Sequence, residues 1–502
     1  MTPSRPGYPF DPSGAPEDPV DPRTDPGVPE RVRTQVEALL TRCTDPTTSQ
    51  SLAEQLIARH EGQGEALRLQ MLPGGNGPGS LVAAGQVVVA PENWRQWRTD
   101  RGSLPAGFTV IEPGETPGDG PGTARSVVGL RLPDGVPLPE GIARLREAGL
   151  QAWVNPVAMA ACPVGKKGDA GPVPVRPRRS LRPAHRPLHG RPVPTPRDVF
   201  IEHRSPVGPL PLAVPPVGIV DTGITDQTRE DGWLAGIPRT RGVVDPLDAL
   251  PRGGDGLLDL GAGHGTFVAG IIEQIDPQIA VTDGLRVHRA LDSDGVGTEE
   301  SVCRSMIQAV QDGQQILCLS FGEFTADDAP PRTMAATIEE IGRLAARHHR
   351  EILLVAAAGN SGDERPCWPA AFSRGAQAFL QEEDPGPVKV VAVAGLTTGR
   401  EPAPWATRGP WVDLSTAAEG ICSVYVEGTE YPSPQNPHPD TYGADPWALW
   451  SGSSFAAPQV VGALTRLCRE RELSPHAALR LLLESGLPLE GFGRAVHLLP
   501  GH

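Results

Sequence analysis

Cysteine is scarce in this 502-residue sequence, and the few cysteines present form no pattern. The seven residues are scattered, odd in number and include no Cys-x-x-Cys pair. Such spacing argues against a disulfide scaffold or a structural zinc site. Free thiols are typical of a reducing compartment, so we expect a cytoplasmic protein.

Long hydrophobic runs are also missing. No stretch approaches the roughly 20 apolar residues that a membrane span needs. The sequence from Met1 to Pro22 has neither the basic start nor the apolar segment of a secretory signal. The net charge of −15 argues against a nucleic-acid-binding role for the whole molecule. We therefore expect neither nucleic acid nor membrane among its partners.

Proline and glycine are plentiful, with 57 and 59 residues, and they mark the borders of the predicted regions. Residues 1–29 are rich in Pro, Gly and Asp without periodicity, which is typical of a disordered tail. Residues 30–78 are predicted to be a helical accessory segment, with a Ser-x-x-Glu capping box at Ser51 starting its second helix. Residues 163–205 are rich in Pro and Arg, which predicts a solvated linker or, more specifically, a protease-accessible hinge.

Residues 80–162 carry a regular alternation of strand and helix patterns. Strands are predicted at 86–90, 108–112, 126–132 and 150–155, and helices at 91–97 and 139–148. The resulting order, β-α-β-β-α-β, is the ferredoxin-like arrangement. Many unrelated domains share it, so it indicates no function by itself.

The last region, residues 206–502, alternates short apolar runs with helical patterns. Strands are predicted at 217–220, 316–320, 352–358 and 388–393, and helices at 265–273, 299–312, 333–349, 454–469 and 475–485. Fully apolar strands alternating with helices predict an α/β fold, in which a parallel sheet is covered by helices on both faces. The chemistry of such sheets lies beyond the carboxyl ends of the strands.

Asp221 ends the first apolar run, in the sequence Gly-Ile-Val-Asp-Thr-Gly at 218–223. A strand that turns at once on Gly223 places this carboxylate at the edge where chemistry is expected. Asp-Thr-Gly is also the core motif of aspartic proteases, which need two such carboxylates sharing one proton. The sequence holds no second copy, so that chemistry would need a dimer. A structural turn is the remaining interpretation.

His264 opens a predicted helix in the sequence Gly-His-Gly-Thr-Phe-Val-Ala-Gly at 263–270. The glycines allow close backbone approach, which is unusual around a histidine that only fills a core. The helix dipole disfavours full protonation of an imidazole at this end, which suits a general base. A lone histidine would more often be structural.

Two further motifs supply a hydroxyl and an amide. Ser454 lies in Gly-Ser-Ser-Phe-Ala-Ala-Pro at 452–458, before a buried helix, where its backbone N–H can point at a developing oxyanion. Taken alone, it could equally be a helix N-cap. Asn360 follows an apolar strand and would present its side-chain amide, although Asn-Ser-Gly is otherwise an ordinary turn.

Taken together, the four motifs resemble the subtilisin-like serine peptidases, the subtilase family, over about residues 207–502. The order Asp, His, Ser is that of subtilisin itself. Leu-Ser-Phe-Gly at 319–322 resembles the family's edge strand that pairs with the substrate backbone, and Asp-Gly-Val-Gly at 294–297 resembles the opposite substrate-binding strand. The resemblance implies a subtilisin-like α/β fold and a serine endopeptidase that acts on proteins or peptides.

The resemblance also implies a role for each site residue. Ser454 would attack the scissile carbonyl, His264 would take and return the proton, and Asp221 would orient the imidazolium. Asn360 and the Ser454 N–H would hold the oxyanion. The substrate-binding walls would be formed by Ser320, Phe321, Gly322, Gly295, Ala357, Ala358 and Gly359.

Some positions depart from the family pattern. Phe267 replaces a second histidine, Phe455 replaces the frequent Met, and Ser453 stands where Thr is usual. None of these changes removes a catalytic group, so they bear on specificity more than on activity. No calcium loop of the family is recognisable, so we expect no cofactor and leave calcium dependence open. Acidic residues near the predicted substrate loops either favour basic substrates or are solvated surface charges: Asp292, Asp294, Glu299, Glu323, Asp363 and Glu364.

Propeptides of this family commonly have the β-α-β-β-α-β fold and end in a tail through the active site. Residues 80–162 are therefore expected to be a propeptide-like, self-inhibiting domain with Val157–Ala161 as its tail; an inert adaptor is the alternative. The helical segment at 30–78 lies outside the resemblance and would dock a partner or support that domain. A scaffold protein with the same fold is a second hypothesis, which the complete triad disfavours.

Overall fold

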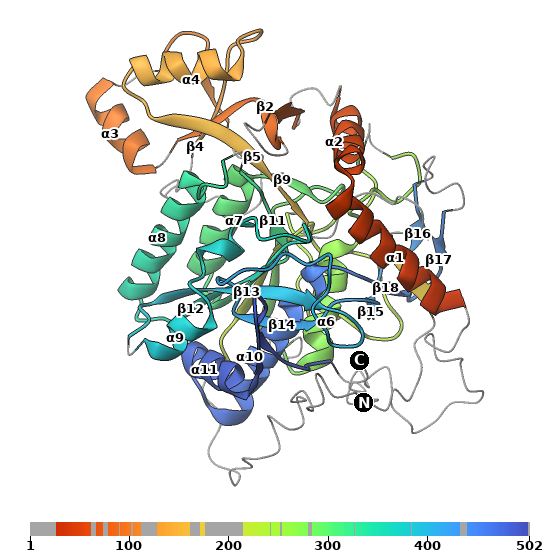
Figure 1. Ribbon diagram of the computed structural model, residues 1–502. Coiled ribbons are helices and arrows are strands. Elements are labelled where there is room, and N and C mark those ends of the chain that lie inside the picture. The colour runs from red at the N-terminus through yellow and green to blue at the C-terminus, as the bar shows by residue number, and fades with distance from the viewer. Residues whose placement is uncertain are drawn as a thin grey trace, which may run out of the picture.

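The structure is a computed structural model, shown in Figure 1, in which a helix-covered sheet carries a smaller antiparallel sheet and two N-terminal helices. It describes residues 27–61, 67–73, 79–89, 91–101, 104–111, 128–160, 171–175, 214–240, 242–250, 254–279, 284–325, 327–382, 384–431 and 439–499. Most of the predicted tail and linker therefore lies outside the described residues.

The central sheet of the described chain has eight strands in the order β19-β20-β14-β13-β12-β10-β7-β8. All neighbouring pairs are parallel except β19 and β20. The predicted parallel sheet is thus confirmed. Its strands are β7 (Val217–Asp221), β8 (Leu285–Arg289), β10 (Ile316–Leu319), β12 (Ile352–Ala357), β13 (Val388–Leu396), β14 (Leu414–Ala417), β19 (Leu487–Leu489) and β20 (Gly493–Ala495).

Helices cover both faces of this sheet, as the apolar strands predicted (Figure 1). Successive strand residues alternate between two cores, so that Ile219 packs in one and Val220 in the other. The first core takes in α6 (His264–Ile275), α10 (Ala457–Arg471) and α11 (Pro475–Ser485), and the second takes in α7 (Glu299–Gln311) and α8 (Arg332–Arg347). The predicted helix at 454–469 was wrong at its start, because a 3₁₀ turn, η2 (Ser453–Phe455), precedes α10 there.

A second sheet is antiparallel and contains the strands of the region 80–160. Its described order is β11-β5-β2-β4-β3, with β1 also paired to β2 and β9 to β5. Strand β5 is longer than predicted and continues beyond 155 to Ala160, between two strands of the last region. The elements are β1 (Leu69–Leu72), β2 (Ser80–Val89), α3 (Pro91–Arg101), β3 (Thr109–Val110), β4 (Val128–Arg131), α4 (Leu138–Glu147), β5 (Ala152–Ala160), β9 (Val296–Thr298) and β11 (Phe321–Gly322).

The N-terminal helices are α1 (Gly27–Thr44) and α2 (Pro46–His60), and they pack on the last region. The capping box predicted at Ser51 was wrong, because α2 already begins at Pro46. Asp45 is its N-cap, accepting a hydrogen bond from the Thr47 amide. Proline suits the first helical position, where an amide has no partner within the helix. In α1, Gln35 is buried and donates to the carbonyls of Gly171 and Leu449.

Part of the predicted solvated linker is instead buried. Strand β6 (Val173–Val175) pairs with β18 (Trp447–Trp450), and Val173 is fully buried, because its apolar side chain joins the core beneath β18.

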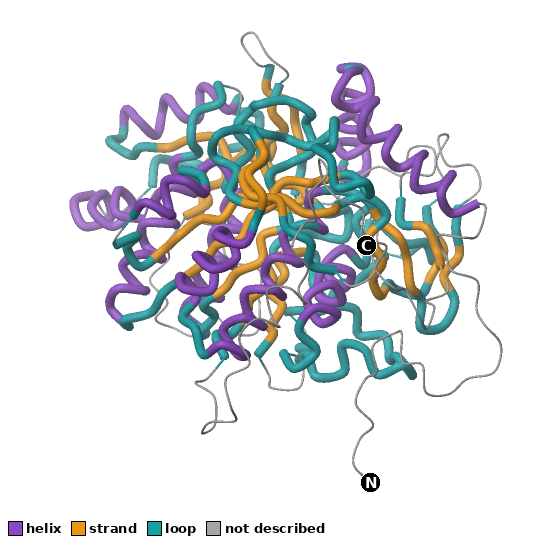
Figure 2. Tube along the Cα trace, turned by 60° about the horizontal axis from the view of Figure 1, so that its bottom comes forward, coloured by secondary structure: helices purple, strands orange, loops and turns teal. Residues whose placement is uncertain are grey.

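Figure 2 shows strands and helices of the whole described chain. Within the described residues, no helix combines the length and apolar character needed to cross a bilayer. The remaining elements are β15 (Ile421–Val424), β16 (Gly428–Thr429), β17 (Thr441–Tyr442), α9 (Ala376–Gln381) and the 3₁₀ turn η1 (Ala370–Phe372).

Candidate active site

Asp221 and His264 meet at the carboxyl end of the parallel sheet. Asp221 is the last residue of β7 and His264 the first of α6, and the His264 Nδ1 lies 2.7 Å from Oδ1 of Asp221. Both side chains are fully buried. The same carboxylate oxygen also accepts from the Thr222 amide at 2.7 Å. The carboxylate therefore fixes the orientation of the imidazole ring.

Two glycines allow this close approach. A Cβ atom on Gly265 would lie 2.1 Å from the carbonyl oxygen of Gly223, so any side chain there would push α6 away from β7. Gly223 itself has φ +112°, a conformation that other residues rarely adopt. The glycines beside both motifs thus set the distance between the two chemical groups.

Sequence reasoning missed a second carboxylate, Asp245, which braces the same junction. Its Oδ2 accepts from the Thr222 hydroxyl and from the Gly263 amide, both at 2.9 Å. Thr222 in turn accepts from the Gly265 amide at 3.1 Å. Burial raises the pKa of Asp245 to about 6, against the effect of these hydrogen bonds. The apolar pair Val243–Val244 before an acidic residue was the available signal, because it repeats the pattern that identified Asp221.

The His264 ring packs against aromatic side chains, and its second nitrogen has no hydrogen-bond partner among the described residues. Trp450 and Phe455 lie with their ring centroids 5.6 and 5.5 Å from that of His264. Within the described residues, Nε2 of His264 is buried and has no hydrogen-bond partner. This nitrogen is therefore available for a proton that a nearby hydroxyl would release.

Ser454 lies in η2 and is fully buried, but its hydroxyl is turned to a backbone group. Its Oγ donates to the carbonyl of Ser320 at 3.2 Å, while the Ser320 hydroxyl donates to the carbonyl of Ser454 at 2.9 Å. A direct Ser454–His264 hydrogen bond, which the family resemblance implies, is not formed here, because the serine hydroxyl is already used. The two bonds hold η2 against the end of β10.

Asn360 follows β12 and is fixed by its own oxygen. Its Oδ1 accepts from the Ser453 amide at 3.0 Å, so its amide nitrogen is free to face another group. That nitrogen, Nδ2, is buried and without a partner among the described residues. A buried N–H donor without an acceptor costs free energy, which a negatively charged ligand oxygen would recover.

The strand β5 lies between the two stretches predicted to bind the substrate backbone. It pairs with β9 through Val157, Ala158 and Met159, and with β11 through Met159 and Ala160. The Ala160 amide also donates to the carbonyl of Gly295 at 2.8 Å. Of the predicted substrate-binding residues, Phe321, Gly322 and Gly295 thus contact β5, and Ser320 contacts Ser454. Ala357, Ala358 and Gly359 are buried at the end of β12, next to Asn360.

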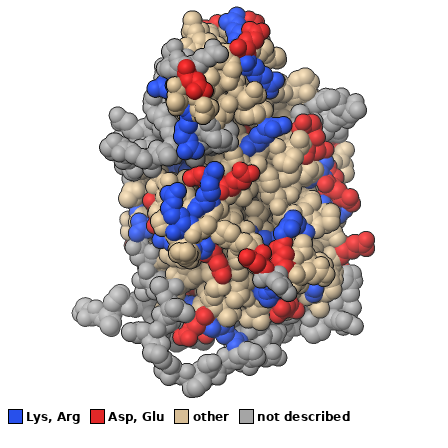
Figure 3. Space-filling model, turned by 90° about the vertical axis from the view of Figure 1, so that its left-hand side faces the viewer, with Lys and Arg blue, Asp and Glu red and all other residues tan. Residues whose placement is uncertain are grey.

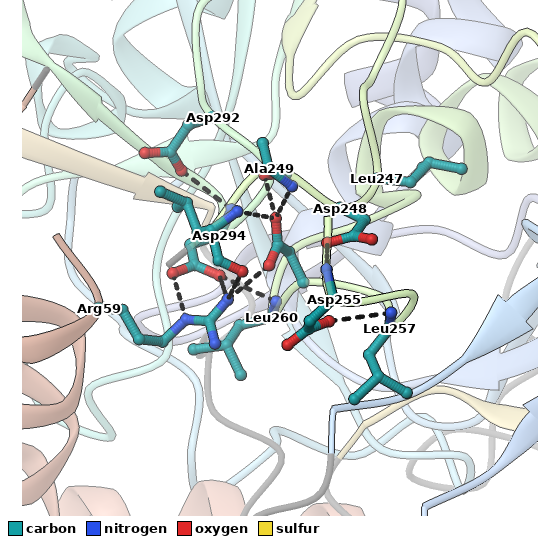
Figure 4. Close-up of polar contacts among 12 residues, drawn as sticks. Arg59, Leu247, Asp248, Ala249, Asp255, Leu257, Leu260, Asp292 and Asp294 are labelled. Carbon is teal, nitrogen blue, oxygen red and sulfur yellow. Dashed lines mark hydrogen bonds and ion pairs between the residues drawn. The ribbon is translucent and has the colours of Figure 1, made fainter. Parts of the chain in front are cut away.

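The loop before β9 is held by the end of α2, as Figure 4 shows. The guanidinium of Arg59 lies 2.7 Å (Nε) from Asp294 and 2.5 Å (Nη2) from Asp259. His60 Nε2 lies 2.9 Å from Asp292 in the same loop. Arg59, Asp259 and Asp294 are all nearly or fully buried. The acidic residues near the predicted substrate loops are therefore not all surface charges, because Asp294 is buried and forms an ion pair with Arg59.

The described residues contain no candidate metal centre. Among them, no group of three or more His, Cys, Asp and Glu side chains is arranged to hold a metal ion.

On the face that Figure 3 presents, basic and acidic side chains are intermingled across largely uncharged surface. That face has no extended basic patch of the kind that tracks a phosphate backbone.

Comparison with known proteins places these features in a family. The family model described as "Subtilase family" matches residues 216–489. A thermostable alkaline protease of Halalkalibacterium halodurans is 28% identical over 205 residues, which cover 40% of this chain and 45% of that protein. Thermitase of Thermoactinomyces vulgaris is 25% identical over 288 residues, which cover 53% of this chain and 83% of that protein. The chain thus spans less than half of the first relative and most of the second.

A similarity to a solved structure extends over more of the chain. Fervidolysin from Fervidobacterium pennivorans, described as a keratinolytic enzyme related to subtilisin, is 16% identical, with a TM-score of 0.49. The similarity covers 85% of this chain and 61% of that one.

Proposed function

The chain belongs to the subtilase family, and on this premise we propose that it is a serine endopeptidase that hydrolyses peptide bonds in proteins or peptides. The observation that carries the proposal is the buried carboxylate–imidazole pair at the carboxyl end of the parallel sheet, 2.7 Å apart, with Nε2 of His264 unused. That end of an open α/β sheet is where such folds place their chemistry.

In the proposed mechanism, Ser454 is the nucleophile. Rotation about its Cα–Cβ bond moves the hydroxyl from its hydrogen bond with the Ser320 carbonyl to one with Nε2 of His264. This nitrogen then takes the hydroxyl proton while the serine oxygen attacks the scissile carbonyl. Asp221 stabilises the imidazolium that forms and keeps the ring oriented through Nδ1. His264 next gives the proton to the leaving amine, and water repeats the sequence to release the acyl group. No cofactor takes part.

The oxyanion of the tetrahedral intermediate is held by Asn360 Nδ2 and the Ser454 amide in this proposal. Support comes from the Ser453–Asn360 bond, which fixes the side chain before any substrate arrives. Donors that are already oriented need no reorganisation when charge develops, and this makes them effective. Ala357–Gly359 and Ser320–Gly322 form the walls beside the reacting carbonyl.

We further propose that residues 80–162 are a propeptide-like domain with the ferredoxin-like fold, and that the chain is made in a self-inhibited form. The described strand order β5-β2-β4-β3 with two helices supports the fold assignment. The end of β5 fills the space between β9 and β11, where a substrate strand would add by backbone pairing. The complete burial of Asp221, His264 and Ser454 fits an occupied site. Residue Ala161, the last of the predicted tail, lies outside the described residues.

The free thiols of the six described cysteines support a cytoplasmic location, which stays part of this proposal. In this proposal, the helical segment predicted at 30–78 docks a partner or supports the propeptide-like domain. Its helices also contact the last region, residues 206–502, through Gln35, Cys43 and Arg59.

A fluorophosphonate probe tests the proposed reaction class. We expect the activated protein to be labelled at one residue, Ser454, because this hydroxyl is the proposed nucleophile, with His264 as its base and Asn360 at its oxyanion site. Mass spectrometry of the labelled peptide identifies the residue. The matched control is Ser485→Ala, which removes a hydroxyl at the end of α11 and should leave labelling intact. If folded protein resists the probe under every activating condition, the enzymatic proposal is wrong.

Cleavage of the chain by itself is the second expected result. During incubation of purified protein, we expect a new N-terminus within the few residues after Ala160. The reason is that Ala160 pairs with Phe321, next to Ser320, whose carbonyl accepts from the Ser454 hydroxyl. N-terminal sequencing locates the cut, and Ser454→Ala protein should stay intact under identical conditions. Cleavage of both proteins at the same bond would point to a contaminating protease instead.

A further inference from the structure

Two buried carboxylates lie at the ends of the strands that flank β5. Glu299 follows β9, whose last residue, Thr298, pairs with Val157. Glu323 follows β11, whose last residue, Gly322, pairs with Met159. The two acidic side chains are only 2% and 1% exposed. Both therefore sit in the protein interior, on either side of the same short stretch of β5.

The fold explains one of these carboxylates and not the other. Glu299 Oε1 accepts from the Met334 amide at 2.7 Å, so it caps the first turn of α8. Both carboxylate oxygens of Glu323 are buried without a hydrogen-bond partner among the described residues. Burial, and then the neighbouring charge of Glu299, raise the pKa of Glu323 well above its usual value. An acidic group in this condition weakens the fold, which suggests a use other than stability.

The side chain of β5 that faces this region is small. Side chains alternate along a strand, and Ala158 is fully buried while Met159 is partly exposed. Ala158 packs in the same apolar cluster as Phe321 and Cys303. The charges of Glu299 and Glu323 both act on the Cys303 thiol and raise its pKa, after the larger effect of burial. The strand pairing places both carboxylates beside position 158, because Glu323 follows the partner of Met159 and Glu299 follows the partner of Val157.

We propose that Glu323, assisted by Glu299, is a specificity-determining residue that binds the ammonium or guanidinium group of a basic substrate residue. That residue takes the position that Ala158 occupies in β5. The inference rests on the proposed function, in which a substrate strand replaces β5 between β9 and β11. A lysine has three N–H donors on a long apolar stem, so the stem packs in the apolar cluster and the donors reach the free oxygens of Glu323.

The first test needs no catalysis and uses the intact Ser454→Ala chain. Ala158→Met adds bulk without charge and Ala158→Lys adds bulk with charge, each in the presence of Glu323 and of Glu323→Gln. With Glu323 present, we expect the Lys chain to melt at a higher temperature than the Met chain. With Gln at this position the order should reverse, because the buried ammonium then has lost its partner. A Lys chain that melts below the Met chain in both backgrounds overturns the subsite.

The second test uses activated enzyme and peptides with the sequence of residues 153–166, varied only at the position of Ala158. We expect kcat/KM for the Lys peptide to exceed that for the norleucine peptide by about tenfold or more, the range of a hydrogen bond to a charged group. The ratio should fall to about one in Glu323→Gln. Cleavage with equal rates for the two peptides in the wild type overturns the subsite. If no peptide is cleaved and no probe labels Ser454, the proposed function fails, and the melting-temperature comparison alone decides the subsite.

Discussion

Ser454→Ala is expected to lower kcat by about 10⁶-fold, a magnitude that was measured on subtilisin, a member of the same family. The reason is that the buried hydroxyl is the only proposed nucleophile, and no neighbouring group replaces its bond to the acyl carbon. The measurement is single-turnover cleavage of a fluorogenic peptide by protein activated before the assay. Ser454→Ala cannot activate itself, so its chain is cut by added wild-type enzyme that is then inactivated with the fluorophosphonate.

The losses of activity in single and double variants show whether Ser454 and His264 act together in one step or contribute independently. His264→Ala should lose about as much activity as Ser454→Ala, and the double variant should lose no more, because the serine and the imidazole act in one step. Asn360→Ala should lose roughly 10²–10³-fold, again the figure known from subtilisin, because the Ser454 amide still serves the oxyanion. Ser485→Ala is the control for a serine remote from the site. Additive losses for Ser454 and His264 would contradict the proposed triad.

The sequence predicted those parts of the site that depend on local pattern. Asp221 ends an apolar strand and His264 begins a helix, so the position of each within its own element follows from neighbouring residues alone. The parallel sheet then brings strand ends to one edge, which is why motifs far apart in the chain could be placed together. The orientation of the Ser454 hydroxyl could not be predicted, because a side-chain rotamer depends on contacts such as the Ser320 carbonyl.

Other features depend on contacts between distant residues and were missed for that reason. The apolar pair before Asp245 repeats the pattern at Asp221, but it does not indicate that Asp245 accepts hydrogen bonds from Thr222 and Gly263. The burial of β6 depends on an edge that β18 provides, more than 270 residues later in the chain. Arg59 looked like one of many charges at a helix end, although both of its carboxylate partners lie 200 or more residues away.

Arg59→Met is expected to reduce the free energy of unfolding by about 3–5 kcal/mol, the usual cost of removing one partner from a buried ion pair. Asp259 and Asp294 are 1% and 0% exposed, and the variant leaves both without their cation. In the wild type, burial acts to lower the pKa of Arg59, but its bonds to Asp294 and Asp259 outweigh burial and raise it. The guanidinium therefore stays charged, and methionine keeps much of its apolar length.

The pH dependence of this loss separates an electrostatic role from simple packing. Burial already raises the pKa of Asp294 above its ordinary value, against the effect of Arg59, and removing the arginine raises it further. A carboxyl group with a raised folded-state pKa binds more protons when folded, so the variant loses stability as pH rises. In urea unfolding of Ser454→Ala chains, the loss caused by Arg59→Met should therefore be larger at pH 8 than at pH 5.

The matched control is Arg33→Met in α1, where both partners of the Arg33–Glu30 pair are largely exposed, so the expected loss is only about 0–1 kcal/mol. A loss for Arg59→Met that is equally small, or that does not change with pH, would show that the acidic loop needs no cation from α2. The expected result would instead mean that the strand β9 owes its position to a helix near the N-terminus. Because that helix lies before the predicted cleavage point, α1 and α2 would then have to remain bound after the chain is cut for the proposed substrate-binding edge to keep its shape.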